Sequence, residues 1–518
     1  MISKPWFRLL AIICVAAFVM FFRLGSVPLL DPDEPVYAET AREMLQYGDL
    51  ISPRIYGDFW YDKPPMYYWL VAGAIRLFGD SEFSARFPSA LLAVGGVVTV
   101  YCAGARLFSD RAGAIAALVL ATSFEYFYLG KAAVTDITLT FFLTVSLLGF
   151  FQGRYYLAYA SAALAVVTKG PIGVVFPALI LGLHYTLTRN WGIWRRLRLI
   201  SGALVFAAIA LPWYGAMYAY HGLEFVNTFL GFHNVTRFLQ PEHPEGKLWY
   251  YYFPVLLVGF FPWTAFLIQA GRAAWRERQS AGGEALSFLL VWAGVVFGFF
   301  TLSQTKLVSY ILPMYPPLAL LVGWYIDRTL AARDRWAVYL AAFVLTLLAG
   351  ALAAALGLAG AKLAPALMPG VVAVCTALAA MVAMVWWSAV RHGGRGTVAS
   401  LTIGMALFVA ALMTALLPAA APAFSMKEFA TAFAARYDGQ TPVYVAKFYR
   451  PGFMYYAGMP GIEIKAAEQA SDVIAGAAGK AYFILSENAY RKLPVSLQGD
   501  LQLLYRQEDK VLLLKDAK

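Results

Sequence analysis

Residues 397–418 read TVASLTIGMALFVAALMTALLP, a stretch without a single charged side chain. A helix of about 20 apolar residues, rising about 1.5 Å per residue, spans a hydrocarbon layer about 30 Å thick. This stretch is therefore predicted to cross a membrane. The whole chain of 518 residues has the same character, because 61% of its residues are apolar and only 14% are charged. Soluble domains contain about 45–50% apolar and about 25% charged residues, so the composition excludes an ordinary soluble protein.

Similar apolar runs elsewhere predict an all-α polytopic membrane protein with about thirteen transmembrane helices. These helices lie within residues 1–422, and a first outer loop, residues 24–83, follows the first of them. The other expected spans are 7–23, 84–107, 112–129, 132–151, 155–168, 170–187, 199–220, 249–270, 286–302, 308–326, 336–357 and 367–388.

The distribution of Lys and Arg predicts the orientation, because cytoplasmic loops retain positive charge. Lys4 and Arg8 place the N-terminus in the cytoplasm. Counting helices from there, every loop predicted to face the cytoplasm is basic. These loops contain Arg106, Arg111, Arg154, Arg189, Arg195, Arg196, Arg198, Arg272, Arg276, Arg278, Arg328, Arg333, Arg335, Arg391 and Arg395. The first outer loop, residues 221–248, a turn near 303–309 and the C-terminal tail fall outside. The net charge of +11 thus reflects loops that face lipid headgroups, and no nucleic-acid partner is expected.

Residues 423–518 are polar and are predicted to form a small C-terminal extracytoplasmic α/β domain. Residues 426–437 have the apolar spacing of a helix, while 441–449, 481–487 and 510–516 have the pattern of strands. A lid, a partner-docking surface and a stabilising cap are all compatible with this domain.

The first outer loop contains LLDPDEPVYAETAREMLQYGDLISPRIYGDFWYDKPPMYYW, residues 29–69, which is dense in carboxylates and aromatics beside a membrane. Charge is costly to desolvate there, so Asp33 and Glu34 indicate chemistry rather than folding. Residues 34–47 have the spacing of a short amphipathic helix that lies in the interface. Asp33 stands at its start. It either caps the helix or points into a cavity while Asp31 or Glu34 provides the cap.

Trp60, Tyr61, Asp62 and Lys63 form the second charged part of this loop. Lys63 either reaches to phospholipid headgroups or binds a specific phosphate. Asp62 beside it would orient that lysine or hold a divalent metal. The aromatic side chains either belong to an interfacial belt or stack on a sugar.

Further polar residues fall on the same outer face. Asp136 lies at the edge of an apolar run, where a carboxylate is expensive and therefore functional by default, although a pair with Lys131 or Lys169 is the structural alternative. Lys306 and Tyr310 open another helix on this face.

His233 and Arg237 are four residues apart, so on a helix they would share a face and could bind a phosphate, or His233 a metal. A metal site that combines His233, His243 and the carboxylates of the first outer loop is a weaker hypothesis, because no clustered ligand spacing exists.

Carboxylates, cations, aromatics and a histidine thus converge on one outer surface beside lipid. That combination suits transfer of a group from a lipid-linked phosphate, because cations can take up the leaving phosphate and a carboxylate can deprotonate an acceptor. A lipid or solute transporter is the alternative from another class. Transporters tend to show inverted repeats and paired broken helices, which this sequence lacks.

The motifs LLDPDEPVYAETAREM, WYDKPPMYYW, AAVTD, FHNVTRF and SQTKLVSYILPMYP occur in this order within residues 1–330. The pattern resembles the membrane glycosyltransferases of the C superfamily, which use lipid-linked sugars. It is most similar to bacterial aminoarabinose transferases that act on lipid A and to related protein-mannosyltransferase-like enzymes. Two departures leave the sugar and the acceptor open: Val36 stands where the lipid A branch commonly has Arg, and Phe232 where it has an acidic residue.

The resemblance also implies roles for individual residues. Asp33 resembles the catalytic carboxylate of the family, Lys63 and Arg237 resemble ligands of the carrier phosphate, and Asp62 falls where the lipid A enzymes place a metal-binding Glu. The complete expected site has Asp33 and Glu34 as catalytic residues, Lys63, Arg237 and Lys306 as carrier-phosphate ligands, Tyr37, Trp60, Tyr61, Asp136, His233 and Tyr310 around the substrate, and Asp62, His233 and His243 as candidate metal ligands.

The expected activity is inverting transfer of a sugar from undecaprenyl phosphate, or another polyprenyl phosphate, to an extracytoplasmic acceptor such as lipid A. A protein O-mannosyltransferase-like enzyme or another envelope glycan transferase is the alternative within this class. The expected location is a bacterial inner membrane, with the N-terminus cytoplasmic and the active site and C-terminus periplasmic. The expected partners are the sugar donor, the acceptor and membrane lipids, and the protein is expected to be a monomer.

Overall fold

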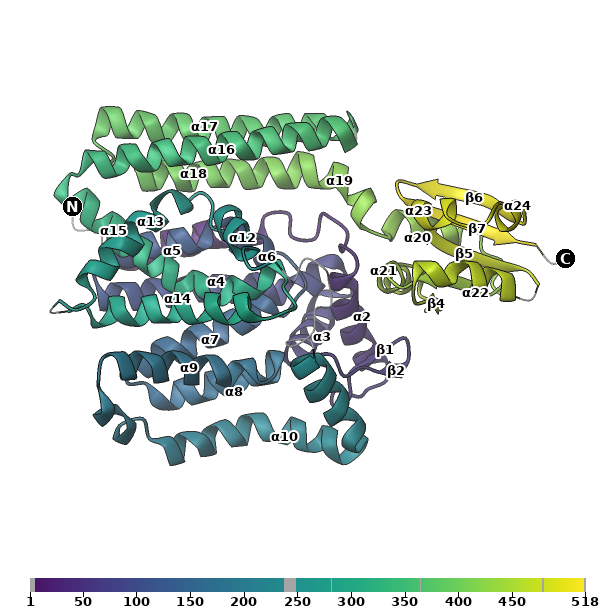
Figure 1. Ribbon diagram of the computed structural model, residues 1–518, viewed down its shortest axis with the longest axis horizontal. Coiled ribbons are helices and arrows are strands. Elements are labelled where there is room, and N and C mark those ends of the chain that lie inside the picture. Colours follow the sequence, from purple (N-terminus) through teal and green to yellow (C-terminus); the bar gives the residue numbers. More distant parts are fainter. Residues whose placement is uncertain (1–4, 237–247, 281, 364, 478, 517–518) are drawn as a thin grey trace.

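The computed structural model describes residues 5–236, 248–280, 282–363, 365–477 and 479–516. A long helical bundle makes up most of the molecule, and a five-stranded sheet with its own helices lies beyond one end of it (Figure 1). The bundle contains α1 (Pro5–Phe21), α4 (Glu82–Leu107), α5 (Asp110–Ala121), α6 (Phe124–Gly130), α7 (Asp136–Phe151), α8 (Tyr155–Lys169), α9 (Ile172–Leu187), η1 (Trp191–Arg195), α10 (Leu199–Val226), η2 (Asn227–Thr236), α12 (Tyr252–Gly259), α13 (Thr264–Glu277), α14 (Glu284–Leu302), η4 (Val308–Met314), α15 (Tyr315–Ala332), α16 (Arg335–Leu363), η5 (Pro365–Leu367), α17 (Met368–His392), α18 (Thr397–Ala411), η6 (Leu412–Leu416) and α19 (Leu417–Phe424).

Among the described residues, six helices are long and apolar enough to cross a membrane, or up to eight if each of two bent helix pairs counts as one span. The chain is therefore a multi-pass membrane protein. The quoted stretch 397–418 lies in one of the six, which runs from Thr397 to Phe424. Four shorter apolar helices also coincide with expected spans or with the first outer loop: Trp6–Phe21, Met66–Phe78, Asp136–Phe151 and Ile172–Leu187.

The two bent pairs break at neighbouring points of the bundle. α5 and α6 meet at 64°, and α12 and α13 meet at 110°. The Phe124 N–H donates to the Phe261 carbonyl at 3.1 Å, and Trp263 Nε1 donates to Thr122 Oγ1 at 2.9 Å. A helix break frees backbone groups that lipid cannot satisfy. The second break therefore supplies an acceptor for one backbone donor at the first, and a side-chain bond joins the two breaks as well.

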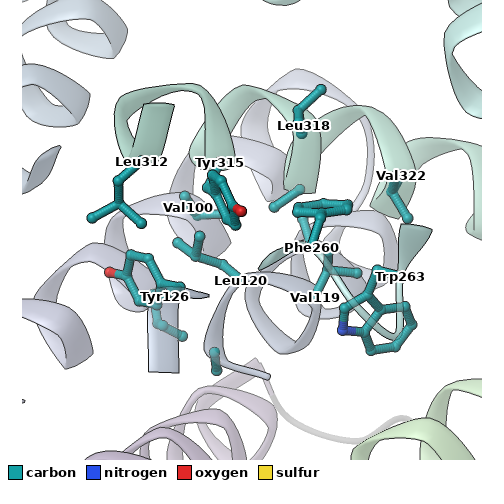
Figure 2. Close-up of a cluster of buried hydrophobic side chains, with 14 of the residues drawn as sticks. Val100, Val119, Leu120, Tyr126, Phe260, Trp263, Leu312, Tyr315, Leu318 and Val322 are labelled. Carbon is teal, nitrogen blue, oxygen red and sulfur yellow. The ribbon is translucent and has the colours of Figure 1, made fainter. Parts of the chain in front are cut away.

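The bundle core surrounds these breaks (Figure 2). Phe260, Trp263 and Tyr315 are fully buried there and pack among aliphatic side chains such as Leu120 and Leu312. The ring centroids of Phe260 and Tyr315 are 5.4 Å apart in an edge-on arrangement, the geometry that aromatic pairs prefer. This packing connects α12 to α15, so the broken helices have a defined position in the bundle.

The expected span 199–220 is too short. The helix continues beyond it, turns at Gly222, whose φ of 58° lies in the left-handed region, and proceeds into the π-helix η2. Glycine adopts this conformation without a Cβ clash. As a result, His233 lies on a helical segment that is continuous with a membrane-spanning helix.

The first outer loop folds into α2 (Asp33–Gln46), a short hairpin of β1 (Arg54–Ile55) and β2 (Asp58–Phe59), and α3 (Met66–Phe78). These elements lie at the end of the bundle nearest the C-terminal sheet (Figure 1). The predicted amphipathic helix is confirmed, because Ala38, Ala41 and Met44 are fully buried on one side of α2. No side chain caps the start of this helix, so Asp33 is not a capping residue.

The C-terminal sheet has the strand order β4-β3-β5-β7-β6, with β3 parallel to β4 and β5, and β7 antiparallel to β5 and β6. Its elements are α20 (Lys427–Ala434), β3 (Val443–Ala446), α21 (Arg450–Ala457), β4 (Ile462–Ile464), η7 (Ala467–Gln469), α22 (Ala470–Gly476), β5 (Ala481–Ser486), α23 (Glu487–Arg491), α24 (Val495–Gly499), β6 (Leu501–Gln507) and β7 (Lys510–Lys515). The helix and three strands expected from the sequence are present. Side chains alternate along β5, so that Phe483 packs on one face and Ile484 on the other.

Polar contacts attach this sheet unit to the first outer loop through α21 and α2. The Leu29 N–H donates to the Tyr456 hydroxyl of α21 at 2.8 Å. The Asp31 N–H donates at 2.9 Å to the carbonyl of Phe424, the last residue of α19, just before the sheet unit begins. The Arg42 guanidinium lies 3.9 Å from the centre of the Tyr455 ring and also donates to the Tyr455 carbonyl at 3.0 Å. The sheet unit therefore holds the segment from which α2 begins.

Gly452 on α21 allows this close approach, because a Cβ at position 452 would overlap the Asp31 carboxylate. We expect Gly452→Ala to lower stability by about 1–3 kcal/mol, the usual cost of overpacking, and to displace the start of α2. The measurement is the midpoint of thermal unfolding together with the activity. Gly476→Ala is the matched control, because a Cβ there meets open space. Equal melting of the two variants would show that the Asp31–Gly452 contact is dispensable.

Candidate active site

A cavity of about 510 Å³ lies where the first outer loop meets the bundle. Segments that are distant in sequence line it: the loop before α3, the start of α7, the end of α8, η2, and the turn between α14 and η4. Its polar lining residues are Asp62, Lys63, Asp136, Lys169, His233, Ser303, Thr305, Ser309 and Tyr310, and its apolar lining residues include Leu139, Ile172, Val175, Phe299 and Phe300. The cavity is thus amphipathic, with charged groups and hydrocarbon walls in one space.

Two ion pairs occupy its polar part. Asp62 Oδ1 lies 2.9 Å from Lys63 Nζ and 2.7 Å from His233 Nδ1, the second contact being outside good hydrogen-bond alignment. Asp136 Oδ1 lies 2.7 Å from Lys169 Nζ, which is also 5.0 Å from the centre of the Tyr310 ring. The cavity therefore holds two ammonium groups, each next to a carboxylate that fixes its position.

The partner of Asp136 is Lys169 rather than Lys131. The Lys131 ammonium instead donates to the carbonyls of Met20 at 3.0 Å and Phe22 at 2.7 Å, at the end of α1. The sequence indicated Lys169 only as a possible partner of Asp136, whereas the structure also places it in the cavity lining. A cation at the end of an apolar run is the signal that points to it.

Asp33 is the first residue of α2, and its side chain is accessible. The surrounding protein nevertheless desolvates its carboxyl group, and this burial is the largest cause of its pKa shift. Burial, followed by repulsion from Asp136 and Asp62, raises the pKa of Asp33, while Lys63 and Lys169 oppose the shift. Asp33 is thus influenced by both ion pairs, although it is not among the described residues that line the cavity. It is the one carboxylate in this group that has no cation within salt-bridge distance among the described residues.

Glu34 has a different environment from its neighbour. It is buried and accepts from Arg86 Nε at 2.8 Å and Nη2 at 2.6 Å, from the Leu30 N–H at 2.8 Å and from the Ala133 N–H at 2.7 Å. Four donors leave this carboxylate little capacity to accept a proton from a substrate. Because Ala133 lies three residues before Asp136, Glu34 connects the start of α2 to the start of α7.

Arg86 was not among the residues singled out by the sequence. It also donates to the carbonyls of Val27 at 2.6 Å and Pro28 at 2.7 Å. An arginine inside the expected span 84–107 is the signal that could have identified it, because intramembrane charges are almost always paired.

The expected aromatic residues lie behind the cavity rather than in its lining. The Tyr37 ring centroid is 5.5 Å from that of Tyr67 and 5.9 Å from that of Tyr68, within a buried cluster that also contacts Trp60. Tyr61 packs against Phe225, with ring centroids 5.9 Å apart. These rings support the loop that carries Asp62 and Lys63.

Lys306 is buried and donates to the Ser303 carbonyl at 2.6 Å, so it stabilises the turn whose residues Ser303 and Thr305 line the cavity. Two other expected residues, Arg237 and His243, lie outside the described residues, and their roles stay predictions.

The residues that the structure describes do not suit the divalent-metal site that the sequence suggested around Asp62 and His233. Among them, no group of three or more His, Cys, Asp or Glu side chains is arranged to hold a metal ion. A cation bound by Asp62 would compete with the Lys63 ammonium, which already lies 2.9 Å from the same oxygen. The arrangement instead resembles an anion site, with ammonium groups and hydroxyls around a space large enough for a phosphate.

Comparison with known proteins identifies similar chains. The family described as dolichyl-phosphate-mannose-protein mannosyltransferase matches residues 62–215. An undecaprenyl phosphate-alpha-4-amino-4-deoxy-L-arabinose arabinosyl transferase of Edwardsiella ictaluri is 32% identical over 62% of this chain and 59% of its own length. The enzyme of the same name, numbered 1, from Pseudomonas fluorescens is 34% identical over 68% of this chain and 65% of its own length. The match thus spans about three fifths of these curated relatives.

Solved structures extend the likeness to the whole chain. ArnT from Cupriavidus metallidurans bound to undecaprenyl phosphate superposes with a TM-score of 0.83 at 23% identity, covering 99% of this chain and 98% of that one. The Archaeoglobus fulgidus oligosaccharyltransferase gives a TM-score of 0.52 at 14% identity, over 94% of this chain and 70% of that one. The expected resemblance to membrane-embedded glycosyltransferases that use lipid-linked sugars is confirmed, and the fold is that of ArnT.

Proposed function

We propose that this protein transfers a sugar from a polyprenyl phosphate, such as undecaprenyl phosphate, to an extracytoplasmic acceptor such as lipid A. The observation that carries the proposal is the amphipathic cavity, in which Lys63 and Lys169 provide positive charge beside hydrocarbon walls. Asp33 is not among the described residues that line this cavity, but the charges of Asp136, Asp62, Lys63 and Lys169 all influence its carboxyl group. A lipid phosphate needs positive charge for its phosphate and an apolar wall for its hydrocarbon chain. The names of the arabinosyl transferases and the undecaprenyl phosphate bound to ArnT support the same donor.

The reaction is an inverting displacement at the anomeric carbon of the sugar. An acceptor oxygen forms the new bond to this carbon, the bond from the carbon to the carrier phosphate oxygen breaks, and polyprenyl phosphate leaves. Lys63 and Arg237 stabilise the negative charge on the leaving phosphate. Asp33 takes the proton of a hydroxyl acceptor, or orients an acceptor phosphate that is already ionised. Glu34 positions Asp33 and Asp136 through its bonds to Arg86 and Ala133 rather than reacting itself.

The proposal includes the arrangement in the membrane. About thirteen spans, with the N-terminus in the cytoplasm, place the first outer loop and the C-terminal α/β domain in the periplasm of a bacterial inner membrane. The location of α2, α3 and the sheet at one end of the bundle supports this arrangement (Figure 1). The protein acts as a monomer in this proposal, because the described residues of the proposed site all belong to one copy.

The direct test uses purified protein in detergent, where no two compartments exist. We expect turnover of undecaprenyl phosphate aminoarabinose with lipid A as acceptor, detected by mass spectrometry of the modified lipid. Other polyprenyl-phosphate sugars and envelope acceptors tested in parallel identify the sugar. If no pair of substrates reacts, while proteoliposomes move the donor between leaflets, the protein is a transporter and the proposal fails.

Removing the Lys63 charge should weaken donor binding. We expect Lys63→Met to raise the KM for the donor roughly 10- to 100-fold, since a hydrogen bond to a charged group contributes about 1.5–3 kcal/mol. Lys63→Arg retains the charge and should recover part of the loss. Lys447→Met removes an exposed lysine from the C-terminal sheet unit and serves as control. A donor KM equal to that of the unmodified protein in Lys63→Met would place the carrier phosphate elsewhere.

A further inference from the structure

A second cavity, of about 550 Å³, lies on the other side of η4. Val308 of η4 lines this second cavity, while Ser309 and Tyr310 of the same helix line the first. Its lining residues come from α6, α12 and the segment before α12: Phe124, Glu125, Tyr128, Leu248, Tyr250, Tyr251, Pro254, Val255, Val258, Gly259 and Val308. The proposed donor site does not use it.

Glu125 is the acidic residue of this cavity and is buried. Its Oε2 accepts a hydrogen bond from the Tyr315 hydroxyl, which Figure 2 shows in the bundle core. Its Oε1 has no hydrogen-bond partner among the residues that the structure describes. A buried polar atom without a partner is costly, and natural proteins rarely retain one without a use for it. A hydrogen-bond donor on a ligand in the cavity would satisfy this oxygen.

Gly259 keeps the carboxyl group at the cavity wall. A Cβ at position 259 would overlap both the Tyr315 hydroxyl and Glu125 Oε2. The absence of a side chain at this point therefore lets the acid and the phenol meet beside the space. A larger residue would push Glu125 away from its present position.

The rim of the second cavity is apolar and accessible. Tyr128, Leu248, Val258 and Val308 are all exposed, on elements that belong to the membrane bundle or flank it. Tyr128 and Val258 lie on helix pairs that are apolar enough to cross a membrane, so the rim faces lipid and the cavity is accessible to a lipid from the bilayer. The combination of such a rim with one buried acceptor oxygen fits a lipid whose acyl chains adjoin an amide N–H or a hydroxyl.

Residues of the second cavity also respond to carboxylates near the first cavity. Tyr128 lies within electrostatic range of Asp33, and Glu125 within electrostatic range of Asp136. The two cavities thus adjoin neighbouring residues of η4, Val308 on one side and Ser309 and Tyr310 on the other. A two-substrate reaction between lipids needs such a pair of spaces.

We infer that the second cavity binds the acceptor lipid, with an amide N–H or hydroxyl of the acceptor donating to Glu125 Oε1 while the donor carrier occupies the first cavity. The reaction in which this acceptor takes part rests on the proposed function. The binding site itself is inferred from the structure alone. Glu125 is a ligand-binding residue in this scheme and takes no part in bond making.

The test measures binding of two probes, hexa-acylated lipid A and undecaprenyl phosphate, to the purified full-length protein. Val255→Trp fills the cavity from its wall, and Leu257→Trp places the same side chain on an exposed position of the same helix. We expect Val255→Trp to weaken lipid A binding at least 10-fold and to leave undecaprenyl phosphate binding within 2-fold. Leu257→Trp should leave both unchanged.

Glu125→Gln gives a second, smaller perturbation that replaces an acceptor oxygen by a donor amide. It should weaken lipid A binding without changing the affinity for undecaprenyl phosphate. Unaltered lipid A binding in both Val255→Trp and Glu125→Gln, or selective loss of undecaprenyl phosphate binding, overturns the assignment. Because these are binding measurements, their outcome is separate from the transfer assay, whose failure would count against the proposed function instead.

Discussion

Asp33→Asn should lower kcat by roughly 10²- to 10⁴-fold, the usual contribution of a positioned general base. The substitution preserves the size of the side chain at the start of α2 but removes its charge and its ability to take a proton. Asp62 and Asp136 cannot substitute, because each is already within 2.9 Å of a lysine ammonium. The measurement is kcat for transfer at saturating donor and acceptor, with protein level and folding checked in the same preparation.

The pH profile distinguishes a chemical role for Asp33 from a structural one. Burial and two neighbouring carboxylates raise the pKa of Asp33 above its ordinary value of 3.8. Activity that needs the ionised form should therefore fall on acidification at a pH above the range of an ordinary aspartate. The raised pKa also means that the folded state binds this proton more tightly than the unfolded state does. Stability is then lost as the pH rises through the shifted pKa, so Asp33→Asn should be at least as stable as the parent protein at neutral pH.

Asp58→Asn is the matched control for this prediction, because Asp58 is exposed in the same outer loop. It should retain full activity and the original pH profile. Retention of full transfer by Asp33→Asn would remove Asp33 from the mechanism. Loss of activity accompanied by a lower melting temperature would indicate that Asp33 serves the fold.

The largest loss of stability is expected for Arg86→Leu, at about 3–5 kcal/mol. This change leaves Glu34 buried without its cationic partner and frees the Val27 and Pro28 carbonyls. An uncompensated buried charge is far more costly than the intact pair is stabilising. The measurement is the thermal unfolding midpoint of purified protein, followed by tryptophan fluorescence.

Arg76→Leu provides the comparison, since Arg76 is an exposed arginine near the end of α3. It should melt within a few degrees of the unmodified protein. An Arg86→Leu variant with an unchanged midpoint would mean that Glu34 finds other partners, and the positioning role proposed for Glu34 would lose its basis.

Much of the architecture could be predicted from local sequence. The apolar runs, the amphipathic helix α2 and the strands β3, β5 and β7 each depend on the spacing of residues within one segment. The extension of α10 beyond Gly222 and the strands β4 and β6 were missed. β4 has only three residues, Ile462–Ile464, and takes its place by pairing with β3. Such pairing depends on a distant segment and leaves little local pattern.

The sequence predicted several of the residues that meet in the candidate site, but not the different environments of two neighbouring carboxylates. Asp62, Lys63, Asp136, His233 and Tyr310 meet in one cavity as expected. Asp33 and Glu34, however, are adjacent residues with the same chemistry, and about 100° of helix rotation separates their directions. Which of them turns to Arg86 and which stays accessible depends on where α4 packs, and no property of either residue specifies that.

The sequence alone determined that the chain crosses a membrane many times and which of its segments carry charge, because the cost of placing polar groups in hydrocarbon acts on every segment separately. The tertiary structure alone decided which charges pair. Lys169 reaches Asp136 while Lys131 binds the end of α1, and Glu34 is neutralised by Arg86 while Asp33 is not. These ion pairs form over a few ångströms between residues that are 33 and 52 positions apart in the sequence, so helix packing selects the partner.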